Sequence, residues 1–460
     1  MNPQSTRRGF LKALGTSGAG LTIAPLLAMN ARAQIGPIAD AGFGRLVAKL
    51  PLNSDLLVNE LGDLRGMPVL ALPESFDYWI ISSTGDVLSD GVGRVPGAHD
   101  GMAAFRGPGG STVLVRNHEL GGSGPGDIRA VVPSGTAYDA TAFGGTTTIV
   151  LDAEGQMVSH VGSLAGTSTN CAGGLTPWNS WLTCEETFED GDTGVRHGYV
   201  FEVPIDGEGS IEPFKDMGRF SHEAVCIDPA TTIVYLTEDR GDSLLYRFRP
   251  NIYGDYRSGG VLEALKLRDF PDGVNTGEGF RDRLFQPMPV EWVAIDVVDP
   301  DTEDNGNSTR AQGQAKGAAV FSRGEGAWWG NGKAYIVATN GGDDGAGQVW
   351  AYNPTDDTLT LFVESIRDPN DPALADNEGF LVAAPDNVTV GPNGRLFLCE
   401  DGSGIEKVVA VNTDGSMFEV LRNVLSDGEF TGACFSPDGN LMFVNIQDPG
   451  LTCVIRGSWA

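Results

Sequence analysis

Short apolar runs separated by glycine-containing turns recur along almost the whole chain, and this repetition limits the possible folds more than any other feature. Runs such as 146–151, 233–237, 396–399 and 408–411 are rich in Val, Ile and Leu, and turns such as 412–415 contain Asp-Gly or Asn-Gly. Such a pattern is typical of short β-strands repeated radially. It predicts an all-β β-propeller, of about six blades with insertions. A large two-sheet sandwich is the alternative.

Composition supports the β assignment. The chain has 64 Gly and 26 Pro among 460 residues and no long Ala/Leu/Glu/Lys-rich periodic segment, so a helical architecture is disfavoured. No Ser/Pro-rich linker divides it. We therefore predict one propeller domain over residues 34–460.

The N-terminus has the pattern of an export signal. Ser5-Thr6-Arg7-Arg8-Gly9-Phe10-Leu11-Lys12 precedes a weakly apolar run over 13–28, and Ala31-Arg32-Ala33 fits a cleavage site before Gln34. This is a twin-arginine signal peptide over residues 1–33. We expect recognition by the twin-arginine export machinery and a periplasmic or secreted protein without a membrane anchor after cleavage.

The mature chain is strongly acidic. The formal charge of the whole sequence is −30, and loss of Arg7, Arg8, Lys12 and Arg32 makes it about −34. Nucleic acids and anionic membranes are poor partners for such a surface. A protein of this charge that acts on anions needs cations to reverse the local field, and bound metal ions can supply them.

The stretch 170–186 concentrates unusual chemistry. Cys171 precedes Ala172 and a Gly pair, and Glu185-Glu186 follow a strand-like run over 181–184. Adjacent carboxylates repel unless a cation or proton holds them, and sulfur beside oxygen ligands suits a transition metal next to a harder ion. We expect Cys171 and Glu186 to bind metal, Cys184 to pack in the core, and at most one or two disulfides among the six cysteines, with Cys171 free.

Polar clusters occur where the apolar runs begin or end. In a propeller these ends surround a central channel, so acids distant in sequence converge and bound cations must offset their repulsion. Asp100, which precedes Gly101, is interpreted as a turn former. The clusters are Asn117-His118-Glu119, His222-Glu223, Glu238-Asp239-Arg240, Arg323-Gly324-Glu325, Asp343-Asp344, Pro385-Asp386-Asn387, Glu400-Asp401 and Glu429.

Common catalytic signatures are absent from the sequence. It has no Gly-x-Ser-x-Gly elbow, P-loop, His-Glu-x-x-His or Cys-x-x-Cys motif, and only five histidines. A histidine-bound zinc hydrolase is therefore disfavoured. Carboxylate and amide oxygens in this number favour calcium, and the Cys171 sulfur favours iron or zinc.

Taken together, these motifs resemble the PhoX-type alkaline phosphatases. The resemblance covers most of the mature chain. Its motifs are the twin-arginine start, Arg116-Asn117-His118-Glu119, Asn170-Cys171-Ala172-Gly173-Gly174 with Thr183-Cys184-Glu185-Glu186, His222-Glu223-Ala224, Arg323-x-Glu325, Glu429-x-Thr431-Gly432 and Asn445-x-Gln447-x-Pro449-Gly450.

The resemblance implies a monomeric six-bladed propeller that hydrolyses phosphate monoesters of small phosphorylated substrates at a site holding ferric iron and calcium. The residues that it places in the site divide by role. Cys171 is implied to be the iron-bridging thiolate, with Glu186, Glu223 and Glu325 as metal-bound carboxylates, Asp386, Glu238 and Asp239 as further calcium ligands, Arg323 as the phosphate contact and Asn117 as a site amide.

One departure from the family pattern leaves other activities open. The family has a second arginine shortly before the Pro-Asp motif, where this chain has Ala384. Fewer fixed cations would then hold a phosphate. Two alternatives follow: a non-catalytic propeller that binds calcium for structure, and a propeller hydrolase of phosphodiesters or lactones.

Overall fold

The computed structural model describes residues 42–459 except 60, 92, 123–126, 304–305, 372–373, 375–376 and 403. The predicted signal peptide over 1–33 lies outside the described residues. Within them, no helix has both the length and the apolar character needed to cross a membrane.

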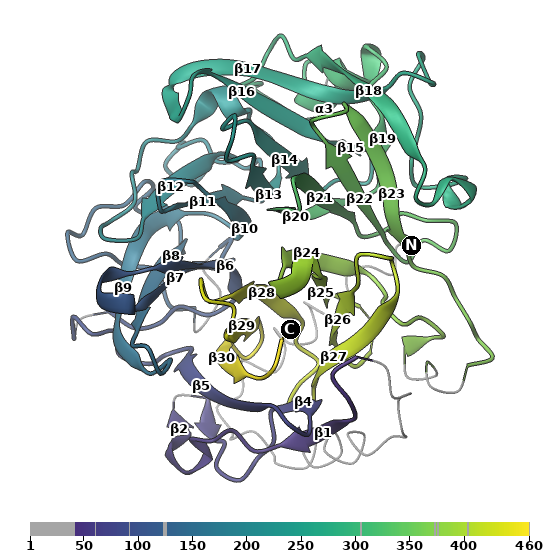
Figure 1. The fold of residues 1–460 in the computed structure, drawn as a ribbon. Helices are drawn as coiled ribbons and strands as arrows, with labels where there is room; N and C mark the ends of the chain where they lie inside the picture. Colours follow the sequence, from purple (N-terminus) through teal and green to yellow (C-terminus); the bar gives the residue numbers. More distant parts are fainter. Residues whose placement is uncertain are drawn as a thin grey trace, which may run out of the picture.

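The described chain is built almost entirely from antiparallel β-sheets arranged around a common centre (Figure 1). Two sheets contain β6 (His99–Arg106), β7 (Thr112–His118), β8 (Gly144–Leu151) and β9 (Met157–Thr167), and β10 (Asn170–Leu175), β11 (Ser180–Glu185) and β12 (Val200–Pro204). A nine-stranded sheet runs in the order β13 (His222–Ile227), β14 (Val234–Glu238), β16 (Tyr246–Ile252), β17 (Asp255–Leu267), β18 (Pro287–Ala294), β23 (Thr358–Glu364), β22 (Gln348–Asn353), β21 (Lys333–Ala338) and β20 (Gly324–Gly330).

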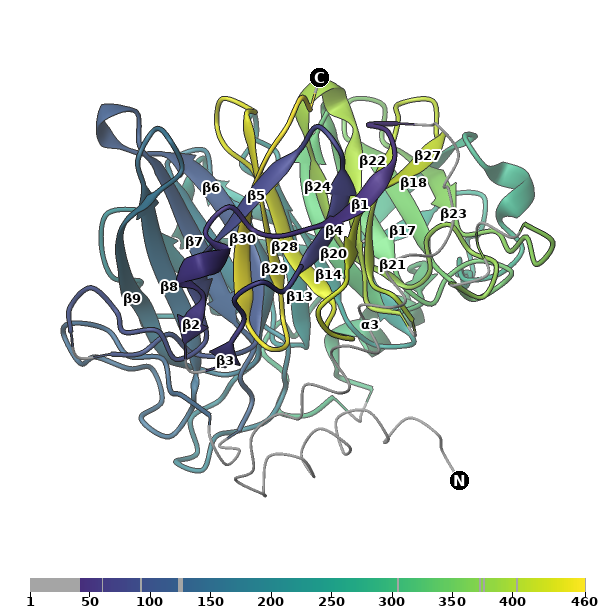
Figure 2. The ribbon, with the colours of Figure 1, turned by 90° about the horizontal axis from the view of Figure 1, so that it is seen from below.

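The remaining sheets join the two ends of the described chain. One runs in the order β1 (Leu46–Lys49), β4 (Leu70–Pro73), β27 (Met417–Asn423), β26 (Lys407–Val411), β25 (Leu396–Glu400) and β24 (Pro385–Val390). Another contains β28 (Phe430–Phe435), β29 (Leu441–Ile446), β30 (Leu451–Arg456) and β5 (Asp77–Ser83). Because β5 pairs with β30, and β4 with β27, an early segment closes the circle against the last strands (Figure 2).

The small elements connect these sheets. Two short ribbons pair β2 (Val58–Asn59) with β3 (Gly62–Asp63) and β15 (Ser243–Leu244) with β19 (Val320–Phe321). The α-helix α3 (Thr309–Ala315) is capped by the Ser308 side chain, which accepts from the Ala311 amide. Single 3-10 turns lie at Ser54–Leu56, Pro108–Gly110, Lys215–Met217, Arg281–Arg283 and Pro392–Gly394.

The innermost strands β6, β10, β13, β20, β24 and β28 contact one another in a closed circle, each touching the next and β28 touching β6. The predicted all-β propeller is therefore confirmed. The number of six blades stays a prediction, because β18 joins the strands that begin with β13 to those that begin with β20 in one sheet.

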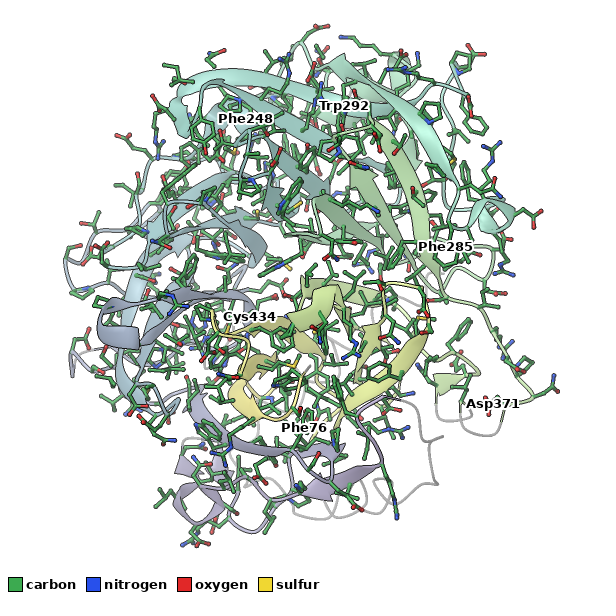
Figure 3. All side chains as sticks on the ribbon, viewed as in Figure 1. Phe76, Phe248, Phe285, Trp292, Asp371 and Cys434 are labelled. Carbon is green, nitrogen blue, oxygen red and sulfur yellow. The ribbon has the colours of Figure 1, made fainter. Side chains whose placement is uncertain are left out.

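The hydrophobic core lies between neighbouring sheets rather than at the centre. One cluster, for example, packs Trp79 and Ile81 of β5 against Met102 of β6 and Leu114 of β7. Figure 3 shows side chains filling the spaces between sheets, with Phe248 and Trp292 among the outer strands. Burying each such side chain contributes about 1.5–3 kcal/mol. The channel-facing ends of the innermost strands are thus free to carry polar groups.

Candidate metal centre

The innermost strands share one irregularity at the same place. Near the start of each strand, two residues oppose a single residue of the paired strand, which is a β-bulge. The bulged dipeptides are Asp100-Gly101, Cys171-Ala172, Glu223-Ala224, Glu325-Gly326, Asp386-Asn387 and Gly432-Ala433. Bulges re-aim side chains, and here five of the six present an acid or a thiol at the same end of the channel.

In five of the six dipeptides, all but Asp386-Asn387, the second residue is Gly or Ala because neighbouring backbones approach closely. A Cβ on Gly101 would lie 2.5 Å from the Cα of Ala172, and one on Gly326 would lie 2.6 Å from the carbonyl oxygen of Asp386. Each separation is shorter than any ordinary carbon contact. Close packing of adjacent innermost strands therefore selects the acid-small pattern.

A second set of polar residues comes from the neighbouring strands. Glu119, Glu186, Asp239, Asp401 and Gln447 each follow directly on the strand that pairs with an innermost strand, namely β7, β11, β14, β25 and β29. These positions lie beside the bulges in the ladder, so both sets meet at one end of the channel.

Residues of the two sets, together with Glu429, form one continuous cluster, which we call the acid cluster. It consists of four overlapping triplets, and within each triplet one possible ligand atom of every residue lies within 4.8 Å of the others. The triplets are Asp100, Glu119 and Cys171; Cys171, Glu186 and Glu223; Glu223, Glu325 and Asp386; and Asp386, Asp401 and Glu429.

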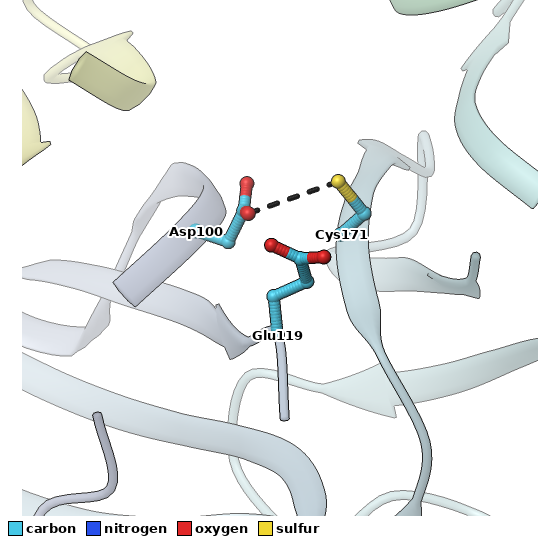
Figure 4. A group of neighbouring side chains, drawn as sticks. All are labelled: Asp100, Glu119 and Cys171. Carbon is cyan, nitrogen blue, oxygen red and sulfur yellow. Dashed lines mark hydrogen bonds between the residues drawn. The ribbon is translucent and has the colours of Figure 1, made fainter. Parts of the chain in front are cut away.

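One end of the acid cluster is held in place by amides. Figure 4 shows the carboxylates of Asp100 and Glu119 facing the Cys171 sulfur, which lies 3.7 Å from Asp100 Oδ2. Gln447 Nε2 donates to both Asp100 Oδ2 and Glu119 Oε2 at 2.9 Å, and Asn445 Nδ2 donates to the Asp100 carbonyl oxygen at 2.7 Å. The side chains of Asn445 and Gln447 thus position Asp100 and Glu119.

Electrostatics at the centre strongly disfavour the ionised forms. Burial, reinforced by Glu325 and Asp386, raises the pKa of Glu223 well above its usual range, and burial with Asp386 and Asp239 does the same for Glu325. Burial and the Asp100 charge raise the pKa of the Cys171 thiol. Burial and the Asp401 charge raise the pKa of Asp386 to about 7.

Glu223 gives the clearest indication that this centre binds a cation. Its side chain is completely buried, and neither carboxylate oxygen has a hydrogen-bond partner within the described residues. A buried polar group normally has a partner, since leaving it without one costs about 1–3 kcal/mol and more when charged. Thiolate and carboxylate donors around it fit a transition metal beside calcium.

Arg323 contacts the acid cluster through Glu325. Its Nε and Nη2 each donate to a different Asp239 oxygen at 2.8 Å, and Nη2 lies 2.6 Å from Glu325 Oε1. Burial lowers the pKa of Arg323, but its bond to Asp239 and the charge of Glu325 raise it above the usual value. Its φ of 55° is a left-handed conformation that non-glycine residues seldom adopt. Because the side chain keeps 36% of its exposure, it can face a substrate.

The predicted site residues do not all lie at this centre. Cys171, Glu186, Glu223, Glu325 and Asp386 belong to the acid cluster, and Asp239 adjoins it through Arg323. Glu238 lies elsewhere, because alternation along β14 turns it to the opposite side from Asp239. It accepts from Tyr246 Oη and pairs with Arg310, both at 2.9 Å. The pair Glu238-Asp239 therefore contributes one candidate ligand, not two.

Asn117, predicted as a site amide, bonds to the backbone of the Cys171-Ala172 bulge. Its Nδ2 donates to the carbonyl oxygens of Cys171 (2.9 Å) and Ala172 (2.8 Å), and its Oδ1 accepts from Trp181 Nε1. With its amide used in this way, Asn117 supports the bulge that presents the Cys171 thiol.

Sequence reasoning missed four members of the acid cluster: Asp100, Glu119, Asp401 and Glu429. Three of them, Glu119, Asp401 and Glu429, belong to the polar clusters at strand ends, but no metal ligand was predicted at these positions. Asp100 was interpreted as a turn residue, although the structure places it within β6. Its dipeptide Asp100-Gly101 matches Glu325-Gly326, and comparing the acid-small pairs with one another would have found it.

The cysteines are all free and buried, so the described structure has no disulfide. Cys184 packs with Leu182 and Val200 in a hydrophobic cluster, as predicted.

This fold and cluster define a β-propeller with a buried acidic centre suited to metal ions. The chain belongs to the PhoX alkaline phosphatase family: the family model described as alkaline phosphatase PhoX matches residues 60–163 and 153–450. It is thus a member of a phosphatase family.

The solved structure of a PhoX protein supports the fold. Pseudomonas fluorescens PhoX in complex with vanadate, a transition state analogue, is 17% identical, with a TM-score of 0.63 over 84% of this chain and 96% of that chain. A Xanthomonas campestris gluconolactonase is 11% identical, with a TM-score of 0.42 over 82% and 94% of the two chains. A search of curated protein sequences finds no match.

Proposed function

We propose that this protein is an exported phosphatase that hydrolyses phosphate monoesters at a centre of iron and calcium held by the acid cluster. The observation that carries the proposal is Glu223, a buried carboxylate for which the described residues offer no hydrogen-bond partner, set between the Cys171 thiol and Glu325 beside Arg323. Membership of the PhoX family supports phosphatase chemistry. Vanadate bound to the P. fluorescens protein supports a phosphoryl transition state in a relative of the same fold.

The donor atoms of the triplets indicate which metal each triplet would bind. Cys171, Glu186 and Glu223 combine sulfur with oxygen and suit ferric iron, whereas Asp386, Asp401 and Glu429 offer only oxygen and suit calcium. When bound, such ions neutralise phosphate charge and lower the pKa of a bound water.

The chain's own residues supply the positioning that phosphoryl transfer requires. Asp239 fixes the Arg323 guanidinium through two parallel hydrogen bonds, so its remaining N–H groups can orient a phosphoryl oxygen without losing much side-chain entropy. Asn117 holds the Cys171 backbone, and Gln447 holds Asp100 and Glu119.

The proposal is tested by turnover of p-nitrophenyl phosphate together with elemental analysis of the same preparation. We expect activity, iron and calcium in the wild type, and loss of activity with loss of metal in Cys171→Ala and Glu223→Ala. Glu238→Gln is the matched control, because this buried glutamate lies outside the acid cluster. Equal activity in all four proteins would refute the site, and calcium without iron or activity would favour a non-catalytic binding protein.

A substrate panel separates monoesters from the other ester classes. Wild-type protein is assayed with p-nitrophenyl phosphate, bis-p-nitrophenyl phosphate and a lactone. Faster turnover of the diester or the lactone would replace the monoesterase proposal.

Export is tested separately. We expect the chain to reach the periplasm only when Arg7 and Arg8 are intact, and Arg7→Lys with Arg8→Lys should retain it in the cytoplasm. Size-exclusion chromatography of the mature protein should show a monomer.

A further inference from the structure

A second arginine, Arg240, lies near Arg323 but makes different contacts. It follows Asp239, the residue that holds Arg323. Its Nη1 donates to Ser221 Oγ at 3.0 Å and to the Asp239 carbonyl oxygen at 2.8 Å, and its Nη2 donates to Glu303 Oε2 at 3.0 Å. These bonds leave two of its five N–H groups without a partner in the described part of the chain.

Backbone hydrogen bonds hold the segments that carry the two arginines next to each other. The Arg323 amide donates to the Arg240 carbonyl oxygen at 3.0 Å, and the Asp239 amide donates to the Ser221 carbonyl oxygen at 3.2 Å. Ser221 precedes His222 and Glu223, so Arg240 lies against the segment that leads into the acid cluster. Its place relative to Arg323 is therefore set by the fold.

Their contacts place the two cations at different depths. Arg323 reaches Glu325 inside the acid cluster, whereas no salt bridge in the described residues joins Arg240 to a member of that cluster. The Arg240 side chain is 34% exposed and its ion-pair partner is Glu303. Both arginines are nevertheless near enough to lower the pKa of Glu186, against the stronger effect of burial.

We propose that Arg240 binds a negatively charged group on the alcohol part of the phosphate ester and thereby makes the site prefer anionic leaving groups. The inference rests on the proposed phosphatase activity. A phosphoryl group held near Arg323 leaves the alcohol extending outward, past Arg240. In a chain this acidic a second negative charge on a substrate is repelled, unless a fixed cation at the entrance compensates for it.

Glu303 affects how strongly the site prefers anionic leaving groups. It accepts from both Arg240 (3.0 Å) and Arg310 (3.3 Å), so it competes with an incoming anion for Arg240. An anionic leaving group takes the place of this carboxylate on the guanidinium, while a neutral one leaves the ion pair intact.

The test compares two esters that differ by one charge, phenyl phosphate and 4-carboxyphenyl phosphate. In Arg240→Gln we expect kcat/KM for the carboxylated ester to fall on the order of ten-fold, mainly through KM, with a much smaller fall for phenyl phosphate. Arg240→Lys should restore part of the difference, since a point charge replaces the planar fork. Glu303→Gln should lower KM for the carboxylated ester alone. Arg65→Gln, which removes an exposed charge whose ion pair among the described residues is with Asp63, should change kcat/KM for neither ester.

The outcomes distinguish failure of the proposed role of Arg240 from failure of the proposed phosphatase activity. If wild-type protein turns over both esters and the Arg240 and Glu303 variants change them equally or not at all, the role of Arg240 is refuted while the phosphatase stands. If wild-type protein turns over neither ester, the proposed function fails and this inference fails with it.

Discussion

Asp386→Asn should stabilise the metal-free protein at alkaline pH, although it removes a candidate metal ligand. Without cations the ionised Asp386 lies half-buried beside Asp401, and desolvation with the Asp401 charge raises its pKa from 3.8 to about 7. Each pKa unit corresponds to about 1.4 kcal/mol, so at pH 8 the ionised group costs about 4 kcal/mol relative to the unfolded chain. Because neighbouring carboxylates relieve part of this cost by taking up protons, we expect Asp386→Asn to gain about 2–4 kcal/mol.

The pH dependence follows from the same shift. Below the unfolded pKa the folded and unfolded chains bind the same proton and no cost is present. As pH rises from about 4 through about 7, the unfolded chain loses this proton first, so the stability of the metal-free wild type falls. The Asp386→Asn variant should lack this part of the fall, and its advantage should be small at pH 4 and complete at pH 8.

The assay is urea unfolding of chelator-treated protein at pH 4, 6 and 8, with and without added calcium. Asp414→Asn is the control of opposite sign, because hydrogen bonds from Ser416 lower the pKa of this exposed carboxyl. Added calcium should reverse the order of wild type and Asp386→Asn. Equal stabilities at pH 8 without metal, or an advantage that does not vary with pH, would refute the reasoning.

Three further predictions concern the centre and its frame. Arg323→Lys should lower kcat/KM for p-nitrophenyl phosphate on the order of 10- to 100-fold with metal content unchanged, because an ammonium cannot replace the bidentate fork; an unchanged kcat/KM would contradict this. Cys171→Ser should abolish visible absorption from iron bound to sulfur while calcium content is retained, as read by spectroscopy and elemental analysis; absorption that persists would remove Cys171 from the iron site. Gly326→Ala should lower the free energy of unfolding by about 1–3 kcal/mol in a urea titration, because its Cβ would lie 2.6 Å from the Asp386 carbonyl oxygen, and no loss would mean that the two strands separate freely.

The strands and turns could be predicted because their signals are local. Runs such as 396–399 and 408–411 lie within β25 and β26, and glycines such as Gly415 occupy the expected turns with positive φ. The bulges could not be predicted in the same way. Asp100-Gly101 forms a turn in most settings, and only contact with the neighbouring strand makes it a bulge. Likewise, Glu238 and Asp239 are equivalent in sequence, and only the register of β14 separates them.

The sixth bulge shows why the acid cluster has its particular composition. Gly432 occupies the position that holds Asp100, Cys171, Glu223, Glu325 or Asp386 in the other innermost strands. Its φ is 60°, and a Cβ there would lie 2.5 Å from the Asp100 carbonyl oxygen and 2.7 Å from Asn445 Nδ2, so no side chain fits.

The missing acid at this position is replaced from outside the strand. Glu429 precedes β28 and meets Asp386 and Asp401, so the triplet is completed by a residue that the repeat does not predict. The space that Gly432 leaves is used by Asn445, whose amide holds Asp100 from the other side. The innermost strand β28 therefore carries no ligand at its bulge, and its close approach at Gly432 allows Asn445 to fix Asp100, while Glu429 supplies a carboxylate from just before the strand.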